Sequence, residues 1–261
     1  MGVVNATPDS FSDGGRFFSE TAAVSHALAL LDAGADILDL GGESTRPHAE
    51  PVSLAEELDR VVPVVAAIKR ARPGAVISVD TMKPAVARAA MRAGASIWND
   101  VTALRGASDS LETAAELGCG VVLMHMLGEP QTMQADPRYD DVVAEVRDFL
   151  AERAQAAVRA GVARGRIWLD PGLGFGKTLE HNLALLRAIP ELKALGFPVL
   201  IGASRKRMIG KLAPLGAPPD ERLGGSLALA LWSAAQGADM VRVHDVRETA
   251  QALRVWGAVA L

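Results

Sequence analysis

The sequence predicts a protein of the α/β class that folds as a single (β/α)8 barrel. Short apolar strands alternate with amphipathic helices along the chain, and eight such pairs fit within its 261 residues. A helix that ends at a glycine and turns at once into a strand recurs at residues 33–36, 93–96 and 236–239. This junction is typical of the second half of a βα unit, so the repetition indicates one unit used many times.

The first unit begins with a strand that opens into a polar loop. Val3 and Val4 are β-branched and apolar, and after Asn5 the chain stays polar up to two consecutive glycines at residues 14–15. Thr21 can cap the helix that follows, because apolar residues then repeat with the helical period until Gly34 ends it. The loop is predicted to be an active-site loop that leaves a buried strand.

The later units follow in the same order. Residues 37–40 form a short apolar strand that ends in the loop GGESTRPHAEP, residues 54–70 form a helix, and residues 75–79 form a strand that closes on Asp80. The remaining strands are expected near Ile97, Val121, Ile167, Val199 and Met240, and the remaining helices near Val86, Leu111, Val143, Leu183, Leu227 and Ala250.

An open, doubly wound sheet is the alternative fold. It usually has fewer strands and a nucleotide-binding fingerprint after its first strand, and no such fingerprint is present here. No linker or low-complexity segment interrupts the units. We therefore expect one domain that covers residues 1–261.

Composition narrows the possible partners. The net charge of −4 lacks the basic excess that a nucleic-acid-binding protein needs. No apolar run is long enough to cross a bilayer, and the amino end has no secretion signal, so no membrane association is expected. The single cysteine, Cys119, cannot form an internal disulfide, which favours the reducing cytoplasm.

Polar or charged side chains follow nearly every predicted strand. They are Asn5, Asp39, Asp80, Asn99, His125, Asp170, Ser204, Arg205, Lys206, Arg242 and His244, with Thr45 and Arg46 in the loop after the second strand. Barrel enzymes build their sites at this carboxyl end of the strands. A single polar residue there is explained by a cap or a loop hydrogen bond, but fold stability does not require charges around a whole rim.

Three of these residues, Asp80, Asn99 and Asp170, come directly after apolar strand residues, where water is scarce. A carboxylate in such a place needs a donor partner. A heterocycle with adjacent N–H and NH₂ groups would offer Asp170 a pair of donors. Lys206 could neutralise a carboxylate or bind a ring atom, and a Schiff-base lysine with a pKa lowered by its arginine neighbours is the alternative.

A second set of residues suits phosphate oxygens. Arg46, Arg242 and His244 bring positive charge, and Asn5 and Thr45 bring hydrogen-bond donors. The segment VRVHDVRE ends a strand and opens a helix, so its backbone N–H groups can also face an anion.

The stretch PGLGFGKT is similar to a phosphate-binding P-loop but departs from it. Pro171 stands where that motif requires its first glycine. We interpret the glycines as allowing the backbone to pass close to a flat ligand, with Phe175 available for stacking. No Ser–His or Cys–His arrangement stands out in the sequence, so no protein nucleophile is expected.

Read together, these motifs resemble the dihydropteroate synthase family of pterin-binding enzymes over almost the whole chain. The matching stretches are GVVNATPDSFSDGG, DLGGESTRP, SVDTMKP, NDVTAL, LMHM, LDPGLGFGKT, GASRKRMIG and RVHDV. The resemblance implies a single TIM-barrel domain that condenses p-aminobenzoate with 7,8-dihydropterin-6-ylmethyl diphosphate. It also implies a Mg²⁺ ion and a homodimer. A related methyltransferase domain that passes a methyl group to a corrinoid, and an inactive pterin-binding barrel, are the alternatives.

The resemblance also implies a role for individual residues. The pterin ring would bind Asp80, Asn99, Asp170 and Lys206. The diphosphate would bind Asn5, Thr45, Arg46, Arg242 and His244, and Asn5 would also touch the Mg²⁺. The p-aminobenzoate would contact Phe11, Thr45, Pro47, Phe175, Ser204, Lys206 and Arg207. The catalytic set would be Lys206, Asp170, Arg46, Asp13 and His244.

Overall fold

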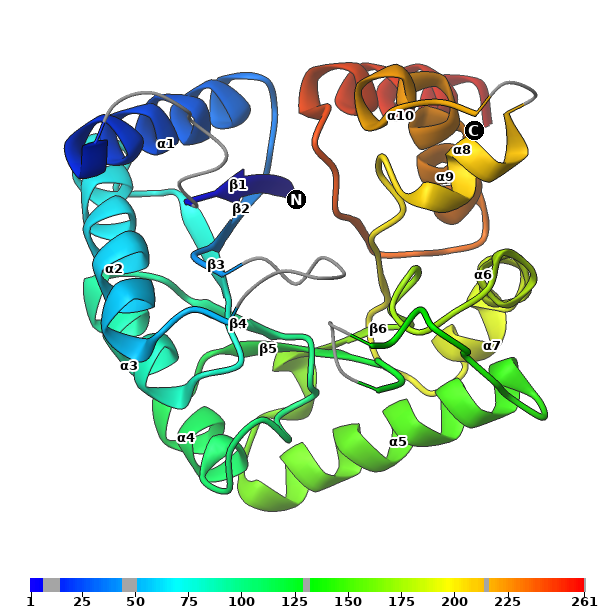
Figure 1. Cartoon of the computed structure of the whole chain (residues 1–261), viewed down its shortest axis with the longest axis horizontal. Coiled ribbons are helices and arrows are strands. Elements are labelled where there is room, and N and C mark those ends of the chain that lie inside the picture. The colour runs from blue at the N-terminus through cyan, green and yellow to red at the C-terminus, as the bar shows by residue number, and fades with distance from the viewer. Residues whose placement is uncertain (7–14, 44–50, 129–131, 214–215, 261) are drawn as a thin grey trace.

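The computed structural model describes residues 1–6, 15–43, 51–128, 132–213 and 216–260, and for residues 15–19 the backbone alone. Figure 1 shows the strands at the centre of the molecule and the helices around them. The strands are β1 (Gly2–Asn5), β2 (Ile37–Gly41), β3 (Val76–Asp80), β4 (Ile97–Asp100), β5 (Gly120–Met124), β6 (Ile167–Asp170), β7 (Leu200–Ile201) and β8 (Met240–Val241).

All eight of these strands run parallel, and the sheet closes on itself. Strands β1 to β6 pair in sequence order, and β7 pairs with β8. Parallel bridges between Leu169 and Val199 and between Gly2 and Val243 join the two sheets at both edges. The Val3 amide donates to the Val243 carbonyl at 3.0 Å across one of these joints. The predicted (β/α)8 barrel is therefore confirmed.

The helices follow the strands in the predicted order. They are α1 (Gly15–Asp32), α2 (Leu54–Ala71), α3 (Pro84–Ala93), α4 (Ser110–Leu117), α5 (Val142–Ala160), α6 (Leu179–Arg187), α7 (Ile189–Lys193), α8 (Arg207–Leu212), α9 (Leu223–Ala235) and α10 (Val246–Ala260). Short 3₁₀ turns occupy Arg164–Arg166 and Pro219–Glu221. Among the described residues, none of the helices combines the length and apolar character needed to cross a bilayer.

Two predictions about the helices need correction. Helix α1 begins at Gly15, so Thr21 lies inside the helix and does not cap it. Nothing between these residues breaks a helix, because the segment contains no proline and no further glycine. Helices α7 and α8 were not predicted from the sequence. Helix α7 is separate from α6 because Pro190 has no N–H with which to continue the hydrogen-bond ladder.

Local capping explains several of the other boundaries. The Ser53 hydroxyl accepts from the Glu56 amide at the start of α2, and the Asp141 carboxylate accepts from two amides at the start of α5. Gly94 and Gly161 end α3 and α5 in the left-handed conformation, with φ of +113° and +112°. Gly94 leads straight into β4, as the recurring junction in the sequence predicts, whereas the 3₁₀ turn at Arg164–Arg166 separates Gly161 from β6.

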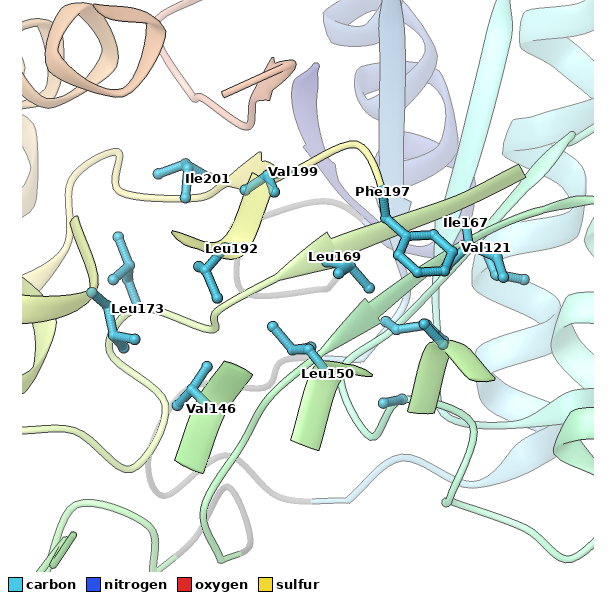
Figure 2. Packing of buried hydrophobic residues seen from close by; sticks show 14 of the residues in the cluster. Val121, Val146, Leu150, Ile167, Leu169, Leu173, Leu192, Phe197, Val199 and Ile201 are labelled. Carbon is cyan, nitrogen blue, oxygen red and sulfur yellow. The ribbon is translucent and has the colours of Figure 1, made fainter. Parts of the chain in front are cut away.

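The core outside the barrel wall is a layer of aliphatic side chains. Figure 2 shows Val146 and Leu150 of α5 facing Leu169 and Ile167 of β6, with Phe197 beside them. Leu150, Ile167 and Leu169 are completely buried. Truncating such a leucine to alanine typically costs about 2–5 kcal/mol, so this layer holds the helices rigidly against the strands.

The interior of the barrel changes from apolar to polar along its axis. Met1, Ile97, Val122 and Leu200 form one buried cluster although they come from opposite sides of the sheet, so they fill the amino-terminal end of the barrel. Two residues further along β4, Asn99 points the same way as Ile97, because side chains alternate along a strand. The carboxyl end of the same interior is therefore lined by polar groups, above a solid apolar floor.

Candidate active site

Arg242 lies at the centre of the polar end of the barrel. It follows β8, and its Nε donates to Asp39 Oδ2 at 2.6 Å while its Nη2 donates to Asp80 Oδ2 at 2.9 Å. Asn99 Nδ2 donates to the same oxygen of Asp39 at 3.1 Å. Side chains from β2, β3, β4 and the end of β8 therefore meet at one point, as the strand-end residues predicted.

Asp39 is the member of this group to which sequence analysis assigned no role. Its side chain is fully buried, and its Oδ1 has no hydrogen-bond partner among the described residues. A carboxylate inside the otherwise apolar strand ILDLG was the available signal. Its position beneath Arg242 makes it the support for the residues that face the mouth of the barrel.

Burial strongly perturbs the acids at the rim. Burial, together with the negative charge of Asp39, raises the pKa of Asp80 to about 7, although Arg242 opposes the shift. Burial also raises the pKa of Asp170, against the positive charge of Lys206. A ligand that donates hydrogen bonds to these groups would favour their charged forms, so the site is suited to a ring rich in N–H groups.

Asp170 and Lys206 form the next part of the rim. Asp170 ends β6, and its Oδ1 accepts from the Gly172 amide at 2.7 Å. Lys206 comes from the turn after β7, donates to the Leu173 carbonyl, and lies 4.6 Å above the centre of the Phe175 ring. Burial lowers the pKa of Lys206 to about 8. The structure thus brings together Asp170, Lys206 and Phe175, which the sequence predicted for the same site.

Arg205 fixes the turn that carries Lys206. Its φ of +58° is unusual for a residue with a side chain and is held by surrounding bonds. The Arg205 amide donates to Ser226 Oγ at 2.9 Å, and its guanidinium pairs with Asp245, with Nε 2.9 Å from Oδ2. This pair joins the turn after β7 to the turn after β8. It therefore fixes the position of Lys206 relative to His244.

His244 and Ser204 face each other across these two turns. His244 Nδ1 lies 3.1 Å from Ser204 Oγ, and the His244 amide donates to the same oxygen at 3.2 Å. The prediction that the chain has no Ser–His arrangement is therefore wrong, because it was made without knowing which strands are neighbours. The hydroxyl accepts a backbone N–H as well, which suits a binding role. Arg207 begins α8 nearby with an exposed side chain.

The loop 171–178 uses its glycines differently from the prediction. Gly172, Gly174 and Gly176 all have left-handed φ, at +66°, +80° and +63°. A Cβ on Gly172 would lie 1.9 Å from the His125 carbonyl oxygen, and one on Gly176 would lie 2.4 Å from the Leu127 carbonyl oxygen. These two glycines therefore allow close packing against the chain after β5, and the interpretation that they make room for a flat ligand is wrong for them.

Phe175 projects from this loop onto a wall of methionines. It packs against the buried cluster of Val101, Met124, Met126 and Met133, beside Met82. Methionine side chains adapt readily to a flat partner, and sulfur makes favourable contacts with aromatic rings. An apolar, aromatic surface therefore lies next to the charged groups of the rim.

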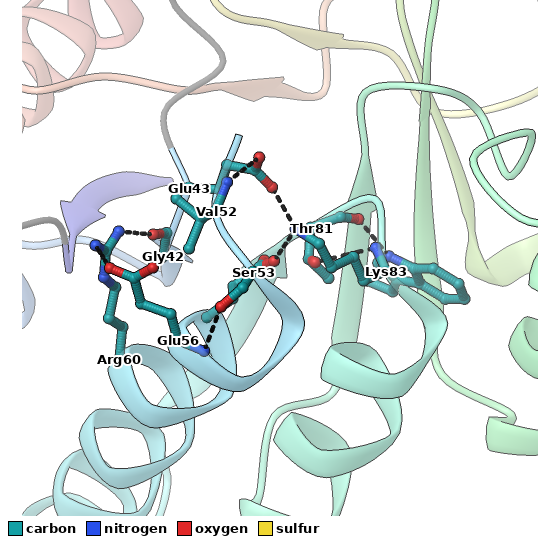
Figure 3. Close-up of polar contacts among 10 residues, drawn as sticks. Gly42, Glu43, Val52, Ser53, Glu56, Arg60, Thr81 and Lys83 are labelled. Carbon is teal, nitrogen blue, oxygen red and sulfur yellow. Dashed lines mark hydrogen bonds and ion pairs between the residues drawn. The ribbon is translucent and has the colours of Figure 1, made fainter. Parts of the chain in front are cut away.

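A buried ion-pair cluster lies at the base of the loop after β2. Lys83 Nζ lies 2.6 Å from Glu43 Oε2 and 2.6 Å from Glu57 Oε2, and Glu57 is fully buried. Glu43 Oε1 accepts from the Val52 amide at 3.0 Å, which joins the two described ends of that loop (Figure 3). Sequence analysis missed this cluster, because its members look like ordinary surface charges in the sequence.

Several predicted residues cannot be placed. Phe11 and Asp13 of the first loop and Thr45, Arg46 and Pro47 of the second lie outside the described residues. Asn5 is described: it ends β1, is half-buried and pairs with Gly41. Its place at the end of β1 puts it on the same rim as Asp80 and Arg242.

Comparison with known proteins agrees with this site. A family model described as "Pterin binding enzyme" matches residues 1–244. The dihydropteroate synthase of Escherichia coli (strain K12) is 52% identical over 255 residues, covering 98% of this chain and 89% of that protein.

Two solved structures extend the likeness to the fold. The Xanthomonas albilineans dihydropteroate synthase with 4-aminobenzoic acid has a TM-score of 0.93 at 51% identity and covers 100% of this chain and 92% of its own. The same enzyme in complex with 7,8-dihydropteroate has a TM-score of 0.89 at 49% identity, with the same coverage. The chain therefore belongs to the pterin-binding enzymes and, among them, to the dihydropteroate synthases, the transferases that make 7,8-dihydropteroate in folate biosynthesis.

Proposed function

We propose that the rim of the barrel divides the synthase reaction between a pterin half and a diphosphate half. The reaction joins p-aminobenzoate to 7,8-dihydropterin-6-ylmethyl diphosphate and gives 7,8-dihydropteroate and pyrophosphate. The observation that carries the proposal is the meeting of Asp39, Asp80, Asn99 and Arg242 at one point, beside Asp170 and Lys206. This arrangement offers acceptors to a donor-rich ring and positive charge to an anion in one site.

The pterin half consists of Asp80, Asn99, Asp170 and Lys206. A pterin presents adjacent N–H and NH₂ groups, which match a carboxylate such as Asp170 in the way that guanidinium does. The raised pKa values of Asp80 and Asp170 support this assignment, because both groups lack enough donors within the protein to offset their burial. Lys206 would bind a ring oxygen or nitrogen from the opposite side.

The diphosphate half consists of Asn5, Arg242 and His244, with Thr45 and Arg46 proposed from the resemblance. Arg242 uses Nε and Nη2 on carboxylates, and among the described residues its Nη1 has no hydrogen-bond partner. That nitrogen is suited to a phosphate oxygen. His244 stands at the start of the turn into α10 (Val246–Ala260), and the N–H groups of a helix amino terminus are suited to bind an anion.

The donor set fits the Mg²⁺ that the family implies. Among the described residues there is no group of three or more His, Cys, Asp or Glu that could hold a metal by itself. Mg²⁺ commonly keeps several waters and is held by substrate phosphates with one or two protein oxygens, so the amide oxygen of Asn5 is a sufficient protein ligand. When bound, Mg²⁺ would neutralise charge that grows on the departing pyrophosphate.

In the proposed mechanism the protein supplies no covalent nucleophile. The bond between the exocyclic methylene carbon and the diphosphate oxygen breaks, and its electron pair leaves with pyrophosphate. The aniline nitrogen of p-aminobenzoate then forms the new C–N bond and loses a proton to solvent. Arg242 and His244, with Arg46, stabilise the charge on the leaving group, while Lys206 and Asp170 hold the ring in place.

The p-aminobenzoate would lie over Phe175 and against Lys206. Its carboxylate would reach Ser204 and Arg207, and Phe11, Thr45 and Pro47 would contact its ring. The methionine wall around Phe175 and the exposed guanidinium of Arg207 support this placement, since one end of the substrate is apolar and the other is anionic. Asp13 completes the proposed catalytic set from the first loop.

A product assay tests the proposal directly. The protein is mixed with p-aminobenzoate, the pterin diphosphate and Mg²⁺, and pyrophosphate and 7,8-dihydropteroate are measured. Equal amounts of both products are expected. A methyltransferase domain or an inactive pterin-binding barrel would release no pyrophosphate.

The proposal extends to the oligomeric state and the compartment. Helices α9 and α10 leave apolar side chains exposed, including Trp232, Val255 and Val259, which supports a homodimer formed through this face. Light scattering of the purified protein should give a mass of twice one chain. The single cysteine is buried and free, which supports a cytoplasmic location.

A further inference from the structure

We infer that Lys177 is a positioning residue for the aminobenzoate side of the site. Lys177 precedes α6, and only 3% of it is exposed. Its ammonium nitrogen donates to the Phe175 carbonyl at 3.0 Å and to the His125 carbonyl at 3.3 Å, and lies 2.9 Å from His125 Nδ1. Three N–H donors thus meet three acceptors, and one acceptor belongs to the residue that carries the stacking ring.

The loop 171–178 needs such contacts because its glycines have no intrinsic preference for the observed backbone conformation. Three of its residues are glycines in the left-handed conformation, and glycine alone does not select one conformation over another. The loop is instead held through its backbone polar groups. Asn182 Oδ1 accepts from the Gly174 amide at 2.7 Å, and the Tyr139 hydroxyl donates to the Gly176 carbonyl at 2.8 Å. Lys177 adds the bond at Phe175 itself.

The chemistry of the pocket around Lys177 favours a holding role. Burial lowers the pKa of Lys177 to about 7, although the charge of Asp170 opposes this. Burial and the nearby ammonium lower the pKa of His125 to about 3, so the imidazole is neutral and its Nδ1 accepts. Burying an ammonium among neutral acceptors costs free energy, because the charge loses its hydration. Removing the ammonium would leave the carbonyls of His125 and Phe175 without a hydrogen-bond donor.

Lys177 and Lys206 hold the loop from its two sides. Lys206 donates to the Leu173 carbonyl at the mouth of the barrel, and Lys177 donates to the Phe175 carbonyl from the buried side toward β5. The Phe175 ring is therefore fixed beneath the Lys206 ammonium at 4.6 Å. A small displacement of a positioned group can change reactivity strongly. The Phe175 ring must therefore keep its position relative to the Lys206 ammonium.

The inference rests on the proposed stacking of p-aminobenzoate on Phe175, and it predicts a selective defect. Lys177→Met removes all three donors and keeps a side chain of similar length. It should raise the KM for p-aminobenzoate about tenfold, while the KM for the pterin diphosphate stays within a factor of about two. Equal increases in both constants would overturn the inference.

The matched control is Lys69→Met. Lys69 also donates to two backbone carbonyls, those of Pro73 and Ala75, at 2.5 and 2.9 Å, but at the amino-terminal end of the barrel. It should leave both KM values unchanged. If Lys69→Met reproduces the effect of Lys177→Met, then loss of a lysine contact anywhere causes the defect, and the inference is overturned.

A double-mutant cycle tests whether Lys177 acts through Phe175. In the Phe175→Ala background, Lys177→Met should change the KM for p-aminobenzoate by less than a factor of about two, because no ring remains to be positioned. A full tenfold effect in that background would contradict the inference. Lys177→Gln, which keeps two donors, should give an intermediate KM and serves if Lys177→Met folds poorly.

Hydrogen exchange separates this inference from the proposed function. Amides of residues 172–178 should exchange faster in Lys177→Met than in the wild type or in Lys69→Met, whether or not the protein is active. Unchanged exchange would show that Lys177 does not hold the loop. A wild type that makes no dihydropteroate would instead refute the proposed function, and the exchange result would still stand.

Discussion

Replacing Asp39 by asparagine should weaken both the fold and pterin binding, because Asp39 supports the centre of the site. The substitution keeps the size of the side chain and removes its charge. The carboxylate now accepts from Arg242 Nε at 2.6 Å and from Asn99 Nδ2 at 3.1 Å. Both donors bind the same oxygen, so an asparagine can keep both contacts through its amide oxygen, but it loses the negative charge beside Arg242 and places a buried NH₂ where Oδ1 has no partner among the described residues.

The size of the effect follows from the lost charge and from the NH₂ group that is left without a partner. A hydrogen bond to a charged group contributes about 1.5–3 kcal/mol, and a buried group left without a partner costs about 1–3 kcal/mol more. Arg242 keeps its bond to Asp80 at 2.9 Å, which limits the loss. We expect the free energy of unfolding to fall by about 2–4 kcal/mol. For a chain of this length, that lowers the Tm by about 5–12 °C.

Thermal unfolding followed by circular dichroism measures this change, and Asp32→Asn is the control. Asp32 pairs with Arg72 at 2.9 Å on the surface, with both side chains at least half exposed. Such a pair contributes at most about 1 kcal/mol, so the control should change the Tm by little. The pterin diphosphate KM should also rise in Asp39→Asn and not in the control. Equal Tm values for the two variants would refute the idea that Asp39 supports the site.

Three further predictions concern the rim. Lys206→Ala and Asp170→Asn should each lower turnover by about 10² or more, measured as pyrophosphate release, and activity within a few-fold of the wild type would show that the pocket is misplaced. Ser204→Ala should raise the KM for p-aminobenzoate and keep most of kcat, whereas loss of all turnover would indicate a nucleophile. The contribution of Asp80 to stability should fall as the pH rises from about 4 to 7 in the ligand-free protein, since the pKa of Asp80 is about 7 when folded and 3.8 when unfolded, so the folded state binds the extra proton. Urea titrations across this range should show that the wild type loses stability relative to Asp80→Asn as the pH rises, because the other titrating groups are common to both proteins, and a constant difference would contradict the prediction.

The fold could be predicted largely from local patterns. Strand and helix periodicity, and the glycine that joins them, recur in nearly every unit, and the eight units then leave few arrangements other than a barrel. Boundaries were less predictable. Thr21 is a good capping residue by type, but the helix starts at Gly15 because the intervening residues are compatible with a helix. Pro190 divides a helix that periodicity alone reads as continuous.

The residues of the site could be predicted from the sequence, but their contacts could not. Residues at strand ends are visible in the sequence, but their partners are set by contacts between distant segments. Arg242 was assigned to an anion, yet it also bridges Asp39 and Asp80, the first of which lies 203 positions away. Lys177 was assigned no role, because the stretch that contains it departs from a phosphate loop, and its contacts with His125 became visible only once β5 and β6 were placed side by side.

Binding of 7,8-dihydropteroate tests most directly the central claim that one rim holds both substrates. This single ligand spans the proposed pterin site at Asp170 and the proposed aminobenzoate site at Phe175. Titration calorimetry should show that Asp170→Asn and Phe175→Ala each weaken its affinity about tenfold or more. Unchanged affinity in either variant would contradict the claim, because it would mean that these residues do not share one site.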